Sequence, residues 1–242
     1  MSPGHHYAPI GDLSPNRRLG LITWITLMCM LAWDYSGLDM GLMQALADTK
    51  GFKLRDNWWL ETLLHTRAKQ LAIVVYLGLL VMVWWPQKAL RQLTRWQRSE
   101  IVVGITLSLI TISTLKSFSL TSCPWELQAF GGPALHVSHW LWGLADGGSG
   151  RCFPGGHVSS AFAFLGLALP WLVSDSASQR QTGLRILGVV LGFGLLLGLT
   201  QTLRGAHFPS HTLWTGFICW TVVLANHFLF GWLAKRRPAH AC

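Results

Sequence analysis

Charged residues are scarce in this sequence of 242 residues, because Asp, Glu, Lys and Arg together make up only 12% of it. Charged residues make up about 25% of a typical soluble domain. Hydrophobic residues account for 51% of the chain, and they gather in long runs. This composition argues against a soluble domain and indicates an integral membrane protein. The net charge is +9. Positive cytoplasmic loops explain that charge, and no continuous basic face indicates nucleic-acid binding.

Several functional motifs are also missing. The five cysteines form no C-x-x-C pair and no zinc-type spacing, so a structural zinc site is not indicated. The chain contains neither a Walker P-loop nor a G-x-S-x-G elbow. Nucleotide hydrolysis and serine esterase chemistry therefore have no support.

Six apolar segments are present, at residues 19–33, 71–85, 101–115, 158–173, 184–203 and 212–234. They predict an all-α fold, a polytopic membrane protein with a six-transmembrane helix bundle. We expect residues 1–18 to form a disordered cytoplasmic tail, residues 19–234 a single membrane domain and residues 235–242 a basic cytoplasmic tail. The first segment is interpreted as an uncleaved helix, because the A-x-A pattern at residues 45–47 lies too far beyond it for a signal peptide.

Positive residues before the first, third and fifth segments and after the sixth predict that both termini are cytoplasmic. They are Arg17, Arg18, Lys88, Arg91, Arg95, Arg98, Arg180, Arg185, Lys235, Arg236 and Arg237. The segment 34–70 departs from this rule, since it lies on the opposite side and carries five Lys or Arg residues. Within it, Asp56 is expected to cap an interfacial helix between the first two spans, with Trp58 and Trp59 at headgroup depth.

Ionisable residues gather at the noncytoplasmic ends of the spans. They are Lys116, Arg151, His157, Arg204, His207 and His211. Each alone is most simply a membrane-interface anchor, but six at one depth predict a functional site. The amides of Gly155, Gly156 and His157 precede an apolar helix, where they are placed to bind an anion. Positive side chains beside them favour phosphate, and two histidines would supply a nucleophile and a general acid.

Three segments in order resemble the signature of the type 2 phosphatidic acid phosphatase superfamily, which shares its site with vanadium haloperoxidases. The first family motif is Lys, six residues, Arg-Pro. Here Lys116 and Pro124 match, with Cys123 in place of Arg. Pro-Ser-Gly-His corresponds to residues 154–157, with Gly155 in place of Ser. In the third motif His207 matches, whereas Thr200, Gln201 and His211 replace Ser, Arg and Asp.

The resemblance implies a membrane lipid phosphatase without a cofactor or required metal. Its site would lie on the periplasmic or extracellular face of the inner or plasma membrane. His207 would form a phosphohistidine, His157 would protonate the leaving group, and His211 would orient His207. Lys116, Gly155 and Gly156 would bind the phosphate, with Arg151 and Arg204 replacing the missing arginines. Substrates by resemblance are phosphatidic acid, phosphatidylglycerophosphate, polyprenyl pyrophosphate or lipid A phosphates.

Convergence of the first two motifs would bring Cys123 near Cys152 on the oxidising side of the membrane. Either a disulfide or two unpaired thiols is then expected.

Other functions remain open at this stage. His157, His207 and His211 are three potential zinc ligands, although nearby Lys and Arg would repel a cation. A phosphotransferase would use the same intermediate with a lipid acceptor. A lipid transporter is disfavoured because the spans are apolar at their centres. The departures from the family motifs also leave a pseudoenzyme open.

Overall fold

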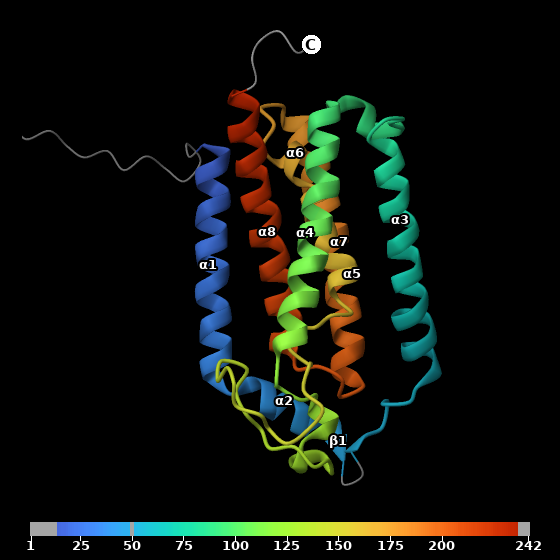
Figure 1. Cartoon of the computed structure of the whole chain (residues 1–242), viewed down its shortest axis with the longest axis vertical. Coiled ribbons are helices and arrows are strands. Elements are labelled where there is room, and N and C mark those ends of the chain that lie inside the picture. Colours follow the sequence, from blue (N-terminus) through green and yellow to red (C-terminus); the bar gives the residue numbers. More distant parts are fainter. Residues whose placement is uncertain (1–13, 49–50, 237–242) are drawn as a thin grey trace, which may run out of the picture.

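The computed structural model describes residues 14–48 and 51–236, and these form a bundle of roughly parallel helices (Figure 1). Within these described residues, five helices are long and apolar enough to cross a membrane. They are α1 (Pro15–Ser36), η2 with α3 (Trp59–Arg67 and Ala68–Met82), α4 (Arg95–Phe118), α7 (Ala177–Leu203) and α8 (Pro209–Lys235). Residues 1–13 and 237–242 of the two predicted tails lie outside the described residues, and Arg17 and Arg18 belong to α1.

The fourth predicted span is not one continuous helix, so the count of six long helices is not confirmed. Residues 158–173 form three short pieces, α5 (Ser159–Phe162), η6 (Ala163–Leu167) and α6 (Leu169–Leu172). Together they run through the bundle from one end to the other (Figure 1). Pro170 has no N–H to donate to the carbonyl four residues earlier. The α-helical ladder is interrupted before it, and the chain tightens into a 3₁₀ helix.

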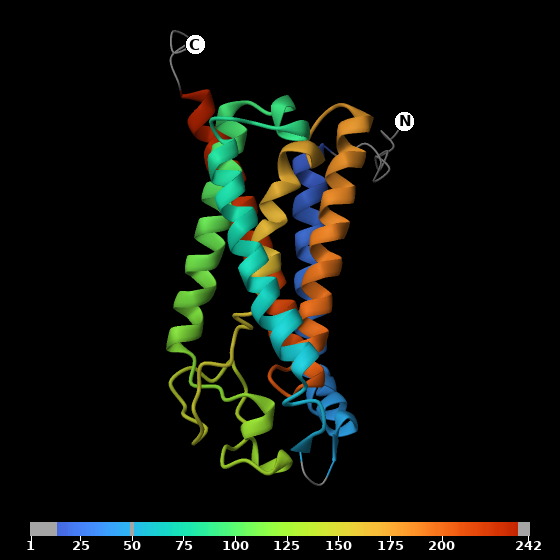
Figure 2. The ribbon, with the colours of Figure 1, turned by 90° about the vertical axis from the view of Figure 1, so that its right-hand side faces the viewer.

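Residues 158–173 pack closely against their neighbours. Val158, Leu165 and Leu169 are almost fully buried in a core cluster that also contains Leu197 of α7 and Val223 of α8. By contrast, α3 lies at the edge of the bundle (Figures 1 and 2). Several of its apolar side chains, such as Val74 at 65% exposure, are exposed. Exposed aliphatic side chains on a membrane helix are expected to contact lipid.

The connections at one end of the bundle are much longer than at the other (Figure 1). At this end α2 (Leu38–Leu46) lies across the bundle, and the hairpin of β1 (Ala47–Asp48) and β2 (Gly51–Phe52) follows it. The structure does not show a separate interfacial helix after Asp56, because Trp59–Arg67 continues directly into α3 and belongs to the same candidate span. Asn57 caps it instead, with Oδ1 accepting from the Leu60 N–H at 3.2 Å.

Residues 119–157 form the longest connection, with two 3₁₀ turns, η4 (Pro124–Glu126) and η5 (Gln128–Phe130). The buried Asp146 carboxylate organises it by accepting hydrogen bonds from the Ser122 hydroxyl at 2.7 Å and the Gly148 N–H at 3.0 Å. At the opposite end, η3 (Lys88–Gln92) joins α3 to α4. The turn between α7 and α8 lies at the same end as residues 119–157 (Figure 1). The three motif-bearing segments therefore meet at one end of the bundle.

Candidate active site

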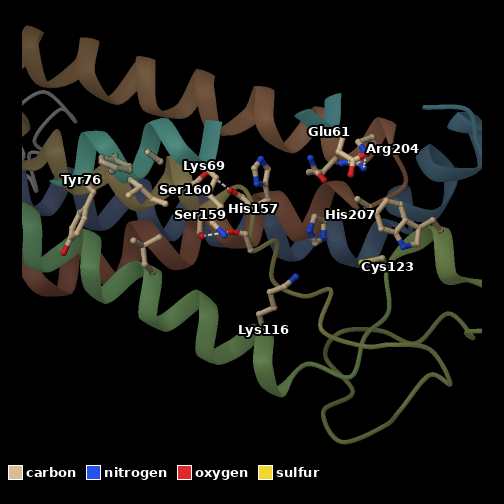
Figure 3. A pocket seen from close by; sticks show the side chains of 18 residues that line it. Glu61, Lys69, Tyr76, Lys116, Cys123, His157, Ser159, Ser160, Arg204 and His207 are labelled. Carbon is tan, nitrogen blue, oxygen red and sulfur yellow. Dashed lines mark hydrogen bonds and ion pairs between the residues drawn. The ribbon is translucent and has the colours of Figure 1, made fainter. Parts of the chain in front are cut away.

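A cavity of about 600 Å³ lies at this end, with residues from all three motifs in its wall (Figure 3). Its polar wall contains Glu61, Lys116, His157, Gln201, Arg204 and His207. Its apolar wall contains Ala72, Ile73, Tyr76, Leu109 and Phe164. In Figure 3, Tyr76 and the histidines lie at different points along the bundle axis, so the cavity extends from the polar end into the bundle.

Lys116, in the last turn of α4, lies against Gly156 of the second motif. A Cβ atom at Gly156 would stand 2.9 Å from Cδ and 3.3 Å from Cε of Lys116. A side chain at this position would therefore displace the flexible end of the lysine. The cation of the first motif is held over the backbone of the second motif.

His157 is held by the segment before α3. Its Nε2 lies 2.9 Å from the carbonyl oxygen of Leu64 in η2. A carbonyl oxygen only accepts, so Nε2 carries the proton in this contact. The turn is fixed further by Ser159, whose hydroxyl donates to the Gly156 carbonyl at 2.7 Å.

His207 lies in the turn between α7 and α8, where it is 6% exposed and lines the cavity. The turn is made by Gly205 at φ 74°, a backbone conformation that favours glycine. The Ala206 N–H donates to the Gln201 carbonyl at 2.8 Å, and the Trp125 N–H donates to the Gly205 carbonyl at 2.9 Å. Trp125 follows the first motif, so the first and third motifs are joined directly through the backbone.

Cys123 and Cys152 form a disulfide. Cys152 is fully buried, and its Sγ lies 3.2 Å from Nδ1 of His207. Within the described part of the chain, Cys123, Cys152 and His207 are the one group whose ligand-type atoms all lie within 4.8 Å of one another. Because the two sulfurs are bonded to each other, neither offers a thiolate to a metal. The trio of His157, His207 and His211 is not such a group among these residues.

Arg204 enters the polar wall from the end of α7 and is 6% exposed. Its Nε donates to the Arg55 carbonyl at 2.8 Å, and a terminal nitrogen lies 3.5 Å from a Glu61 carboxylate oxygen. Both partners come from the segment 34–70, whose role the sequence does not reveal. This segment therefore supports both Arg204 and His157.

Three predicted site residues lie outside the cavity. Arg151 is exposed at φ 57°, and its backbone N–H donates to the Ser119 carbonyl at 2.8 Å. Gly155 is buried behind the cavity and is held by Thr215, whose hydroxyl donates to its carbonyl at 3.2 Å. His211 is fully buried, with its ring centroid 5.8 Å from that of His207. Neither of its ring nitrogens has a hydrogen-bond partner within the described residues.

Gln201 was not predicted as a site residue. It is 3% exposed and lines the cavity, and its side-chain nitrogen has no hydrogen-bond partner among the residues that the structure describes. A buried donor without a partner carries a free-energy cost that a ligand acceptor would relieve. Its place in the third motif, where the family has Arg, is the sequence signal that points to it.

One titratable group in the connection 119–157 has a shifted pKa. Burial lowers the pKa of His139, and the nearby carboxylates of Asp34 and Asp39 oppose the shift only in part. Its Nε2 lies 3.4 Å from an Asp34 carboxylate oxygen. His139 also contacts His211 at 5.8 Å between ring centroids, which places it behind His207 and outside the cavity wall.

Comparison with known proteins places these features in a family. Residues 99–236, more than half of the chain, match the model of the PAP2 superfamily. No curated protein matches the chain. A solved structure, the first transmembrane PAP2-type phosphatidylglycerolphosphate phosphatase from Bacillus subtilis, is similar at a TM-score of 0.50 and 15% identity. The match covers 94% of this chain and 100% of the other, and at this identity it shows a shared fold.

Proposed function

The chain belongs to the PAP2 superfamily, and from that premise we propose that it is a membrane phosphatase that hydrolyses a phosphate ester or pyrophosphate on a lipid headgroup. The observation that carries this proposal is the cavity, whose polar wall has two histidines and the cations Lys69, Lys116 and Arg204, and which continues into an apolar wall. Such a cavity suits a molecule with a phosphate joined to a hydrocarbon chain.

The apolar wall supports a lipid as the substrate. Ile73 and Tyr76 come from α3, Leu109 comes from α4, and Phe164 comes from the η6 segment. Since α3 lies at the edge of the bundle (Figure 1), an acyl or prenyl chain against this wall would lie close to the bilayer. A lipid then keeps its tail in hydrocarbon while its phosphate is at the polar end.

The reaction proceeds in two displacements. His207 Nε2 attacks phosphorus, the bond from phosphorus to the leaving oxygen breaks, and the His157 imidazolium, whose Nε2–H is bound to the Leu64 carbonyl, gives that oxygen the proton of Nδ1. Water then attacks the phosphorus of the phosphohistidine, and His157 takes a proton from this water. The phosphorus–nitrogen bond breaks, which releases phosphate and regenerates the neutral imidazole of His207. Lys116, Arg204 and the Gly156 amide stabilise the charge that spreads over the phosphoryl oxygens.

The site is proposed to face the noncytoplasmic side. The first residues of α1 and the last residues of α8 lie at the end opposite the cavity (Figure 1). The basic residues Arg17, Arg91 and Lys235 also belong to segments at that opposite end. The positive-inside rule assigns that end to the cytoplasm.

Phosphate release by purified protein in detergent tests the function. The substrates are phosphatidic acid, phosphatidylglycerophosphate, a polyprenyl pyrophosphate and lipid A, each with a chelator present. We expect release from at least one of them, inhibition by vanadate, and a loss of at least about 10³-fold in His207→Gln, because removal of a nucleophile removes the covalent route. Product analysis with an added acceptor lipid separates hydrolysis from phosphotransfer.

Equal rates in the wild type and His207→Gln would contradict the mechanism. Activity that is lost on chelation and restored by zinc would contradict a metal-independent reaction. A phosphoenzyme that is labile in acid and absent from His207→Gln would identify the intermediate directly.

A further inference from the structure

The group next to the proposed nucleophile is the sulfur of a disulfide. Cys152 Sγ lies 3.2 Å from Nδ1 of His207 and 3.0 Å from the carbonyl oxygen of Ala206, and Cys152 is fully buried. The other half of the disulfide, Cys123, lines the same cavity as His207. The disulfide therefore joins the cavity wall, at Cys123, to the Nδ1 side of the His207 ring, at Cys152.

We propose that the Cys123–Cys152 disulfide positions His207 and fixes its tautomer, so that the activity of the site depends on this bond being oxidised. A disulfide sulfur carries no proton, so it can only accept a hydrogen bond, although weakly. The proton of the neutral imidazole is then held at Nδ1. The lone pair is left on Nε2, the nitrogen that attacks phosphorus. The catalytic part of this inference rests on the proposed function.

The residue expected to orient the nucleophile does not contact it in this way. His211 occupies the position of the family carboxylate, yet neither ring nitrogen makes a hydrogen bond within the described residues. Its ring packs edge-on against Phe153 and Phe208, with centroids 5.2 and 5.3 Å away. His211 thus fills space behind His207, while Cys152 Sγ lies within hydrogen-bond distance of Nδ1.

Reduction changes what the sulfur is able to do. A dithiol gives two electrons and two protons to the disulfide, which becomes two thiols, while the dithiol closes to its own disulfide. The Cys152 thiol is now a donor as well as an acceptor. It no longer restricts the proton to Nδ1, so the tautomer with the proton on Nε2 becomes populated. That tautomer has no lone pair on Nε2 for attack.

Two measurements test this positioning role. The first is the ¹⁵N spectrum of protein labelled at the histidine rings, in which the His207 signals are those absent from His207→Gln. The second is kcat and KM for phosphate release, measured below the unfolding temperature of every sample. Both are compared between oxidised wild type, wild type treated with a dithiol, and Cys123→Ser, which keeps Cys152 as a thiol. A chelator stays present because the freed thiols and His207 could bind a metal.

Cys29→Ser is the matched control, because Cys29 is a free, exposed cysteine on α1. It should keep the wild-type response to the dithiol in both measurements. In oxidised wild type we expect His207 to carry its proton on Nδ1. In the reduced wild type and Cys123→Ser we expect the Nε2–H form to appear beside the Nδ1–H form and kcat to fall several-fold, in proportion to the share of the Nε2–H form, with KM little changed. A histidine in the wrong tautomer costs as much as about 10⁴ in the serine protease triad.

Each outcome has one meaning. A disulfide that is absent from the purified oxidised protein overturns the inference, as does an unchanged His207 signal after reduction. A fall in kcat without a change of tautomer also overturns it, because the disulfide would then act only on the stability of the loop. A change of tautomer in a protein that hydrolyses none of the lipid phosphates would support the positioning and contradict the proposed function.

Discussion

Histidines at the two ends of the bundle are held by different kinds of partner. Near the opposite end, His227 Nδ1 lies 2.7 Å from a carboxylate oxygen of Glu100, which is 6% exposed. At the cavity, His157 contacts the Leu64 carbonyl and His207 contacts the Cys152 sulfur. Neither of the two histidines in the cavity wall is thus seen to be held by a carboxylate, whereas His227 at the other end is. Neutral partners orient a ring without adding negative charge beside an anionic substrate.

The two ends should differ most in their effect on kcat when one histidine at each end is replaced by glutamine. His157→Gln removes the proposed general acid, and we expect a loss of about 10²–10⁴-fold in kcat for a lipid phosphate. His227→Gln keeps an amide that can donate to Glu100, so its kcat should stay close to that of the wild type. Phosphate release under saturating substrate is the measurement.

A leaving group that needs no proton sharpens this test. With a phosphate ester of an acidic phenol, His157→Gln should lose far less activity than with a lipid phosphate, because the departing phenolate is stable without a proton. An equal loss with both substrates would contradict the role of His157 as an acid. Impaired catalysis in His227→Gln would contradict the functional difference between the two ends.

Much of the site could be predicted from the sequence, because topology alone brings distant span ends to one side. Lys116, His157 and His207 lie in motifs whose spacing is short and whose flanking segments are strongly apolar, so their common depth follows from counting spans. The polytopic all-α architecture follows from the same segments. The structure brings all three residues to one cavity.

The remaining features depend on contacts that no local pattern encodes. Arg151 was expected in the cavity because of its charge, but its backbone turns at φ 57° and leaves the side chain exposed. The contact between His157 and the Leu64 carbonyl joins residues 93 positions apart. Every residue has a backbone carbonyl, so the amino-acid sequence does not indicate which one accepts this hydrogen bond. The broken fourth span is an exception, because Pro170 is a local signal in the sequence that a count of hydrophobic residues does not register.

The next prediction concerns the cation at the cavity end of α4. Gly156→Ala adds a methyl group 2.9 Å from Lys116 Cδ, so the flexible lysine has to move while the backbone stays in place. We expect kcat/KM to fall by about 10- to 100-fold, as for a lost charged hydrogen bond to phosphate, with little change in the unfolding temperature. Gly188→Ala is the matched control on α7, where a Cβ meets nothing within 4 Å. A Gly156→Ala protein with full activity would show that catalysis does not depend on the present position of Lys116.

A smaller effect is expected at the amide of Gln201. Gln201→Leu removes a buried donor that would pair with a phosphoryl oxygen, and we expect kcat/KM to fall by about 3- to 10-fold, the equivalent of one hydrogen bond. Gln201→Glu should be more impaired than Gln201→Leu, because its carboxylate would repel the phosphate. Steady-state kinetics on the preferred lipid measures both. The reverse order, or no effect from either change, would remove Gln201 from the substrate contacts.

The smallest effect is expected at His139. This residue lies beside a carboxylate, as His227 does, but it belongs to the connection next to the cavity. Burial lowers its pKa in the folded protein despite Asp34 and Asp39, and His136 and His211 also face it. The unfolded chain therefore binds a proton at His139 more readily than the folded one as the pH falls through about 6.5, the ordinary value for histidine. Stability from the neutral ring is complete above that pH and is lost on acidification. The unfolding temperature should thus fall between pH 7 and pH 5, and it should fall less in His139→Gln. The same slope in both proteins would mean that folding does not lower the pKa of His139, and a steeper fall in His139→Gln than in the wild type would mean that the carboxylates hold the ring as an imidazolium and would place His139 with the charged pairs.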